Sequence, residues 1–179
     1  MVTVKRIWNF IWHDDSIWSW LVNIALAFII VKFILYPLIG LLLGTSYPVV
    51  AVMSGSMEHD GNFDQWWESQ NKLYEELKIT KEQFKTFKFM NGFNKGDIII
   101  LTKAKDIQIG DVIVFSANTA EPIIHRVVKT ENGIQTKGDH NLGSRQDEVN
   151  IDQTKILGKA LFRVPYLGWL KLGFVSLIQ

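Results

Sequence analysis

The sequence predicts an α+β protein, in which an N-terminal transmembrane helix precedes a mainly β domain with a helical insertion. Two observations lead to this expectation. One long apolar run lies near the start of the chain, and several short β-branched runs, bounded by Gly-Asp turns, lie in its second half. The 179 residues suffice for one modest domain plus a membrane segment.

Charge and cysteine content exclude several function classes. The formal net charge of +1 gives no electrostatic argument for binding nucleic acid, and we expect no nucleic-acid partner. The chain has no cysteine, which excludes a disulfide framework, a thiol nucleophile and a cysteine-ligated metal.

Residues 1–16 are expected to form a cytoplasmic or interfacial N-terminus. Lys5 and Arg6 are followed by apolar residues at helical offsets, which are Ile7, Trp8, Phe10, Ile11 and Trp12. This pattern is typical of a short amphipathic helix that lies on a membrane face.

A transmembrane signal-anchor is predicted over residues 17–44. Residues 17–43 are almost wholly apolar, and roughly 20 such residues span a bilayer. Lys32 at mid-depth costs about 2.5–3.5 kcal/mol on insertion scales. Each apolar residue contributes about 0.3–0.6 kcal/mol in the opposite direction, so the run still inserts.

The charged flanks predict the orientation of this helix. Lys5 and Arg6 precede it, whereas no Lys or Arg follows it until Lys72. The positive-inside rule therefore places the N-terminus in the cytoplasm and residues 45–179 outside or in a lumen. A cleaved signal peptide is the alternative, but the run is too long for its apolar region and no Ala-x-Ala site ends it.

Residues 60–92 form a polar, aromatic-rich insertion with helical periodicity. Apolar and aromatic residues recur at helical spacing, which are Trp66, Trp67, Leu73, Tyr74 and Leu77. Thr80 and Gln83 fit a capping box that opens a second short helix. We favour a helical hairpin packed on the domain over the alternative of a membrane-dipping or substrate-guiding flap.

The remaining chain reads as strands of one extracytoplasmic domain. Buried strands are predicted at 98–101, 112–115 and 123–128, and a turn, a strand and a second turn at 133–139. The apolar segment 165–179 is too short to span comfortably, so an interfacial helix is expected there.

A candidate nucleophile follows the apolar run 49–52. Ser54-Gly55-Ser56-Met57 ends this run, and glycine allows a sharp turn that could present the hydroxyl of Ser56. The alternative is an ordinary strand-to-loop turn, in which Ser54 and Ser56 only satisfy backbone groups.

A serine nucleophile needs a base, and four histidines are candidates: His13, His59, His125 and His140. His13 is expected on the cytoplasmic side and is excluded. His59 is expected in a mobile loop, whereas His125 lies within an apolar strand, where it is either aimed by a rigid scaffold or is a satisfied core residue.

The aspartates Asp139 and Asp147 could orient an imidazole and stabilise its protonated form. His140 could reach the same region. A metal site is disfavoured because no HExxH or comparable spacing occurs, and neither metal nor other cofactor is expected.

Six motifs appear together in order: Ser54–Met57, Lys95–Ile99, Gly110–Phe115, Pro122–Val127, Thr136–Asn141 and Arg163–Trp169. Behind a signal-anchor, this series resembles type I signal peptidase of the archaeal and endoplasmic-reticulum branch. The resemblance runs from the membrane helix to the C-terminus, and leaves the first residues and the insertion unmatched.

The resemblance implies a role for each matching residue. Ser56 corresponds to the nucleophile, and the hydroxyl of Ser54 with the backbone N–H of Ser56 to the oxyanion hole. His125, where the bacterial branch has lysine, corresponds to the general base. Asp139 matches the first of two family aspartates, and Asp147 is the candidate for the second at a longer spacing. Which of them hydrogen-bonds His125 stays open.

The function implied is that of a membrane-anchored serine endopeptidase that removes N-terminal signal peptides after small residues. Its implied partners are signal peptides of secretory preproteins, membrane lipid and additional subunits, since relatives act alone or in complexes. An extended substrate could pair with a strand edge. The alternatives are a non-catalytic, membrane-tethered binding module for exported or partner chains, and a self-cleaving or regulatory serine peptidase.

Overall fold

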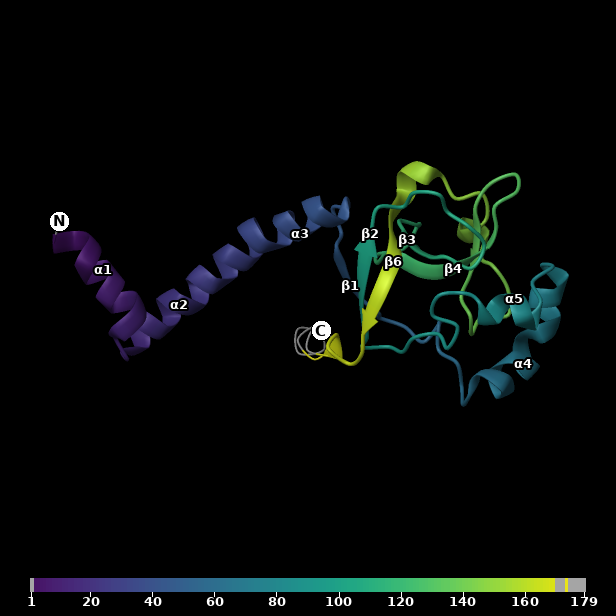
Figure 1. Cartoon of the computed structure of the whole chain (residues 1–179), viewed down its shortest axis with the longest axis horizontal. Helices are drawn as coiled ribbons and strands as arrows, with labels where there is room; N and C mark the ends of the chain where they lie inside the picture. The colour runs from purple at the N-terminus through teal and green to yellow at the C-terminus, as the bar shows by residue number, and fades with distance from the viewer. Residues whose placement is uncertain (1, 170–172, 174–179) are drawn as a thin grey trace. The chain divides into compact units, whose positions relative to one another are not determined.

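The computed structural model describes residues 2–169 and 173 (Figure 1). The chain divides into two compact units, residues 1–42 and residues 43–179. Each has its own internal packing.

The first unit is helical. It consists of α1 (Val2–His13), α2 (Ile17–Ile30), the π-helix η1 (Val31–Leu35) and the start of α3 (Tyr36–Leu43). The helix α2 begins after Ser16, whose hydroxyl accepts a hydrogen bond from the N–H of Ser19. The side chains of Ser19 and Asn23 donate to carbonyls of α1 and so tie the two helices together.

Residues 17–43 form a continuous helix of 27 residues, and within the described residues it is the one helix long and apolar enough to cross a membrane. Lys32 lies in its π-helical turn, with the ammonium 5.5 Å from the ring centre of Phe28 and 5.3 Å from that of Phe33. Two aromatic faces therefore partly compensate the charge within an otherwise apolar segment.

The second unit is built on one six-stranded sheet, in the order β1-β2-β6-β3-β4-β5, with every neighbouring pair antiparallel. The strands are β1 (Val49–Ala51), β2 (Ile98–Thr102), β3 (Val112–Phe115), β4 (Ile123–Lys129), β5 (Gln135–Lys137) and β6 (Ile156–Val164). The fold is thus α+β, as the sequence predicts, and β1 and β5 are the edges of the sheet.

The predicted Gly-Asp turns precede β2 and β3. Gly96 and Gly110 have φ of 88° and 94°, in the region that favours glycine. The register against β6 shifts after Ile100 and again after Val114, and such irregularities bend a sheet. The sheet can therefore curve around the apolar cluster formed by Val52, Met57, Phe93, Ile99, Leu101, Val112, Val114 and Ala160.

The insertion folds as α4 (Phe63–Glu76) and α5 (Lys81–Lys85), which lie on the side of the domain away from β1 (Figure 1). Asn62 and Gln65 form a capping box at the start of α4, and Thr80 caps α5. The aromatic side chains of these helices pack on β4 in a cluster of Trp66, Trp67, Tyr74, Ile79, Phe84 and Val128. The insertion therefore has the packed helical arrangement that the sequence favoured.

Two short 3-10 helices, η2 (Gln146–Glu148) and η3 (Gln153–Lys155), precede β6. After β6 the chain turns, and the N–H of Gly168 donates to the carbonyl of Gly96. The interfacial helix expected over 165–179 falls mostly on residues outside those that the structure describes.

Candidate active site

The serine motif leaves β1 as a tight turn. The N–H of Val52 donates to the carbonyl of Asp97 (2.9 Å) and the N–H of Gly96 donates to that of Val52 (2.9 Å), which fixes the exit of the strand. Two residues later, the turn that includes Ser56 closes through a hydrogen bond from the N–H of Glu58 to the carbonyl of Gly55. The two serine hydroxyls are thereby held 3.2 Å apart.

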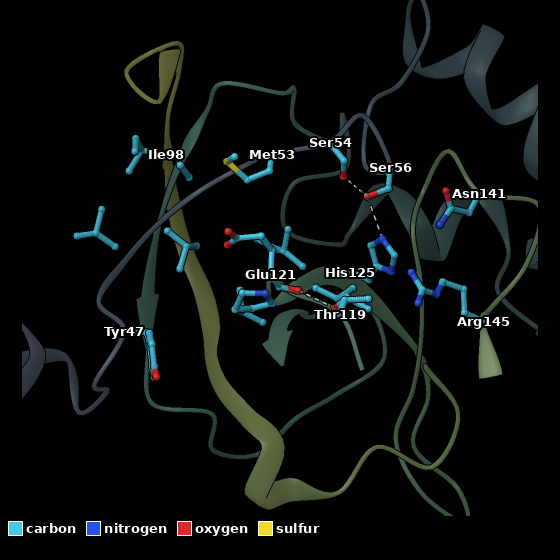
Figure 2. A pocket seen from close by; sticks show the side chains of 17 residues that line it. Tyr47, Met53, Ser54, Ser56, Ile98, Thr119, Glu121, His125, Asn141 and Arg145 are labelled. Atoms are coloured by element: carbon cyan, nitrogen blue, oxygen red, sulfur yellow. Dashed lines mark hydrogen bonds between the residues drawn. The ribbon is translucent and has the colours of Figure 1, made fainter. Parts of the chain in front are cut away.

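His125 lies on β4, opposite this turn, with 4% of its surface exposed. Its Nε2 is 2.9 Å from the Oγ of Ser56 (Figure 2). The other ring nitrogen, Nδ1, is hydrogen-bonded to the carboxylate of Glu148. The structure therefore places a hydroxyl, an imidazole and a carboxylate in one line of hydrogen bonds.

Glu148 is fully buried at the end of η2. Its carboxylate also accepts hydrogen bonds from the hydroxyl of Thr136 (3.1 Å) and the N–H of Arg145 (2.8 Å). Burial by itself would raise the pKa of Glu148, but the hydrogen bond and charge of His125, with these other donors, outweigh it and lower the pKa. A charged Glu148 favours the tautomer with the proton on Nδ1, which leaves Nε2 free to accept the proton of Ser56.

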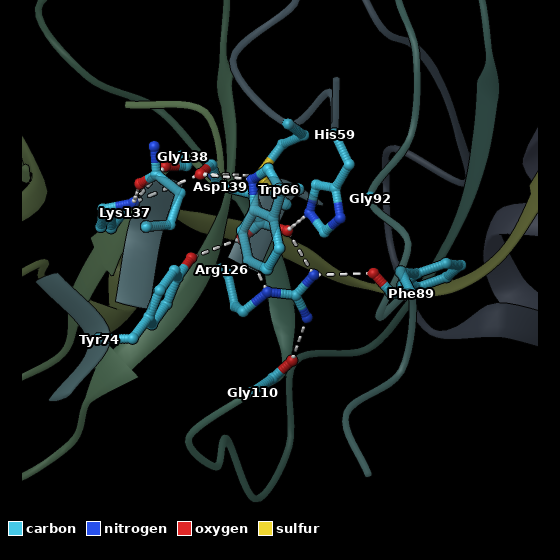
Figure 3. A network of polar contacts seen from close by, with 12 residues as sticks. His59, Trp66, Tyr74, Phe89, Gly92, Gly110, Arg126, Lys137, Gly138 and Asp139 are labelled. Atoms are coloured by element: carbon cyan, nitrogen blue, oxygen red, sulfur yellow. Dashed lines mark hydrogen bonds and ion pairs between the residues drawn. The ribbon is translucent and has the colours of Figure 1, made fainter. Parts of the chain in front are cut away.

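Asp139 points away from His125. Its carboxylate is fully buried and accepts hydrogen bonds from Arg126 Nε (2.9 Å), Arg126 Nη2 (2.6 Å) and the Tyr74 hydroxyl (2.9 Å) (Figure 3). Successive side chains of a strand point to opposite faces, so Arg126 lies on the other side of β4 from His125. Asp139, which pairs with Arg126, lies on that same side.

The charges of this buried pair support each other. Burial by itself would raise the pKa of Asp139, but Arg126 and the hydrogen bond from His59 hold it well below its usual range. Burial would lower the pKa of Arg126, and Asp139 more than offsets this, so that the pKa rises. The pKa of Tyr74 lies well above its usual value because of burial and the adjacent Asp139.

Asp147 pairs with the guanidinium of Arg145 at 2.8 Å. Neither of the two aspartates singled out in the sequence contacts His125, and the position expected for one of them is occupied by Glu148. The sequence signal for Glu148 is only its place in the acidic pair with Asp147. Asp147 and Glu148 are adjacent in η2, and the directions of their side chains determine that Glu148 reaches His125.

The other histidines lie outside this line. His59 lies in the loop before α4, but its side chain is buried: the ring stacks on Trp66 at 3.6 Å between ring centres, and its Nε2 is 3.0 Å from Asp139. The side chain of His140 is half-exposed and 3.5 Å from Asp60, while its N–H donates to the carbonyl of Ser56. Within the described chain, no group of three or more His, Asp or Glu side chains could hold a metal ion.

Gly138 is a residue of the site that the sequence analysis did not single out. A Cβ at this position would lie 2.7 Å from the carbonyl of Ser56 and 2.8 Å from Nε2 of His125. Any side chain here would displace the serine or the imidazole. The turn Lys137-Gly138-Asp139 is the signal in the sequence for this position.

A groove of about 570 Å³ leads from Ser56 along β1, and we call it the β1 groove. Its walls are mostly apolar and include Val50, Met53, Ile98, Val114, Pro122 and Ile124. Because β1 is an edge strand, its backbone can pair with an extended peptide lying in this groove.

No protein-family model matches the chain. Among individual proteins, it is similar to signal peptidase complex catalytic subunit SEC11C of Homo sapiens and of Mus musculus, with 28% identity over 141 residues. These homologues are named as catalytic subunits of a signal peptidase complex. The aligned segment covers 71% of this chain and 57% of SEC11C, so the chain spans little more than half of the length of these relatives.

The fungal signal peptidase subunits align over more of their length. SEC11 of Colletotrichum graminicola is 26% identical over 165 residues, which cover 84% of this chain and 77% of the relative. SEC11 of Scheffersomyces stipitis is 22% identical over 169 residues, with 87% and 80% covered. These similarities agree with the resemblance to the endoplasmic-reticulum branch of signal peptidases and support a peptidase.

Proposed function

We propose that this protein is a membrane-anchored serine endopeptidase that removes N-terminal signal peptides from exported preproteins. The observation that carries the proposal is the hydrogen-bonded line of Ser56, His125 and Glu148 at the end of an apolar groove. The homologous signal peptidase subunits support the same activity.

In the proposed reaction, Ser56 attacks the carbonyl of the scissile bond while Nε2 of His125 accepts its proton. Glu148 stabilises the imidazolium that forms. The oxyanion is held by the backbone N–H of Ser56 and the hydroxyl of Ser54. His125 then protonates the leaving amine, and a water molecule hydrolyses the acyl-enzyme with His125 again acting as base. Asp139 and Asp147 take no direct part.

The substrate proposed is the extended end of a signal peptide, lying in the β1 groove. Main-chain hydrogen bonds to β1 would provide affinity, and the apolar walls next to Ser56 would select small residues before the cut. The substrate is thus recognised by backbone shape and small side chains.

The membrane arrangement proposed is a single pass through residues 17–44, with the N-terminus cytoplasmic and the catalytic domain on the outer or lumenal face. The long apolar helix and the basic residues Lys5 and Arg6 before it support this orientation. Because the relatives are named subunits of a signal peptidase complex, we also propose that further subunits are partners.

The test is cleavage of a preprotein by the detergent-solubilised full-length chain. We expect wild type to cut after a small residue and Ser56→Ala and His125→Ala to be inactive. Ser54→Ala should lower kcat by about 10²–10³, the usual cost of one oxyanion donor. If Ser56→Ala cuts as fast as wild type, the nucleophile is assigned wrongly. If wild type binds preproteins and never cuts them, a tethered binding module replaces the peptidase.

A further inference from the structure

A second hollow adjoins the catalytic residues on the side of the insertion, and we call it the α4 groove. It encloses about 830 Å³ and is lined by Gln65, Trp66 and Ser69 of α4 and by Asp60, His140 and Leu142, among others. Asn141 and Arg145 line both this hollow and the β1 groove. The two grooves therefore meet beside Ser56 and His125.

The order of residues across the site indicates the path that a bound peptide takes from one groove to the other. Figure 2 shows Ser56 and His125 between Tyr47, Met53 and Ile98 on one side and Asn141 and Arg145 on the other. A peptide that lies along β1 and crosses Ser56 in an extended conformation must leave the site past Asn141 and Arg145. The α4 groove begins at these two residues.

The α4 groove has a rigid floor. The indole of Trp66 is buried, donates to the carbonyl of Asp139 (3.2 Å) and stacks on His59. Gln70 accepts a hydrogen bond from the ammonium of Lys137 (3.0 Å). These contacts fix α4 to the segment that follows β5, so the shape of the groove is coupled to the segment that carries Gly138.

The rim of the α4 groove is open to solvent. The side chain of Leu142 is 82% exposed and offers one apolar contact to a chain bound in the groove. Ser69 and Gln65 are exposed on α4, and Asp60 and His140 provide charges that can be of opposite sign. A rim with one apolar contact and several polar groups of mixed type can bind polypeptides of varied sequence.

We propose that the α4 groove binds the first residues of the mature chain, those directly after the scissile bond. The inference rests on the proposed peptidase function, and it gives the insertion at residues 60–92 a role as one wall of the substrate site. An apolar side chain of the mature segment would cover Leu142. The β1 groove then holds the signal peptide, and the α4 groove holds the leaving chain.

The test compares two substrates with the same sequence up to the cut. The long one continues for about six residues, which extend at most about 20 Å, and the short one ends one residue after the cut. The variants of the full-length protein are Leu142→Ala, which removes the apolar contact, and Ser69→Tyr, which fills the groove. Glu68→Tyr adds the same side chain to α4 at an exposed residue that does not line the groove.

We expect Leu142→Ala and Ser69→Tyr to lower the ratio of kcat/KM for the long substrate to that for the short one by about three- to tenfold, the usual effect of one apolar contact. Glu68→Tyr should keep the wild-type ratio. The inference is overturned if both groove variants keep the ratio while wild type cleaves normally. If Ser69→Tyr does not fold, Leu142→Ala decides the test, because its side chain is mostly exposed.

Failure of the peptidase function gives a different result. If wild type cleaves neither substrate, the assignment as a peptidase is overturned and the inference falls with it. A wild-type enzyme that cleaves both substrates, with unchanged ratios in the two groove variants, overturns the inference alone.

Discussion

Three acidic side chains follow β5 within a short stretch, and their directions separate their roles. Asp139 faces Arg126 and Tyr74, Asp147 faces Arg145, and Glu148 faces His125. The backbone positions of Asp147 and Glu148 differ by one residue, yet only Glu148 reaches the imidazole. A carboxylate can be expected near His125 from the sequence, but its identity depends on the turn of η2.

We predict that Glu148→Gln lowers kcat by about 10⁴-fold, as amidation of the orienting carboxylate does in a serine peptidase triad. The amide would favour the wrong tautomer of His125 and could not stabilise the imidazolium. Asp147→Asn, the matched change one residue earlier, should keep kcat within a few-fold of wild type. The measurement is steady-state cleavage of a preprotein. A large loss in Asp147→Asn with little in Glu148→Gln would reverse the assignment.

At the scale of elements, Arg126 and Asp139 connect the sheet to the insertion. Arg126 on β4 also donates to the carbonyls of Lys88, Phe89 and Gly110. Tyr74 of α4 and His59 also form hydrogen bonds with the carboxylate of Asp139. The segment that carries Gly138 is therefore held in place by hydrogen bonds from two other parts of the chain.

We expect Asp139→Asn to destabilise the protein by about 3–5 kcal/mol, because it leaves the buried charge of Arg126 without its partner. The measurement is chemical denaturation at neutral pH. The double variant Arg126→Met with Asp139→Leu removes both charges and should recover part of the loss. If Asp139→Asn keeps the wild-type free energy of unfolding but loses kcat, Asp139 has a catalytic role instead.

Lys137 makes the stability of the folded protein depend on pH, and the direction of this dependence follows from its pKa. Burial lowers its pKa from 10.5 to about 8, although Asp139 and Glu148 act in the opposite direction. Between these values the unfolded chain binds more protons than the folded one, so the contribution of Lys137 to stability rises with pH. The free energy of unfolding, measured from about pH 8 to pH 9.5, should rise less in Lys137→Met than in wild type. An equal slope in both would contradict the prediction.

The strands with local signals could be predicted from the sequence. The runs at 98–101, 112–115 and 123–128 correspond to β2, β3 and β4 within one residue at their ends. The strand β6, at the centre of the sheet, was not anticipated, because Gly158, Lys159 and Arg163 interrupt its apolar pattern. Its pairing with both β2 and β3 is a long-range property that local periodicity does not report.

The proximity of Ser56 and His125 could also be predicted, since both residues belong to recognisable motifs. The surroundings of Asp139 could not, because they depend on which face of β4 each side chain occupies. His59 is a similar case. Its stacking on Trp66 arises from the fold of the insertion, whose helices the sequence indicated without showing where they would pack.

At the scale of the whole molecule, the second unit contains every residue of the proposed mechanism. The sheet, the insertion and both grooves belong to residues 43–179. The carbonyl of Leu43 accepts hydrogen bonds from the hydroxyl of Thr102, the last residue of β2, and from the N–H of Lys103, so the packing of this unit begins at that residue. We therefore expect the long apolar helix to determine location and not to be required for assembly of the site.

We predict that a chain lacking residues 1–42 unfolds cooperatively and cleaves a short peptide in solution with a kcat close to that of the full-length protein. Its cleavage of preproteins embedded in vesicles should be much slower, because enzyme and substrate no longer share a membrane. Circular dichroism during heating measures the first property, and parallel assays with the two substrates measure the second. A truncated chain that does not fold would show that the helix contributes to the second unit.

The spacing of Ser56, His125 and Glu148 along the chain has a consequence for when the proposed activity can begin during synthesis. Its members are separated by 69 and 23 residues along the chain. A nascent chain that has been translated only as far as His125 has a nucleophile and a base, but lacks the carboxylate that fixes the tautomer. Under the proposed mechanism, the nascent chain therefore lacks peptidase activity until residue 148 has joined the fold.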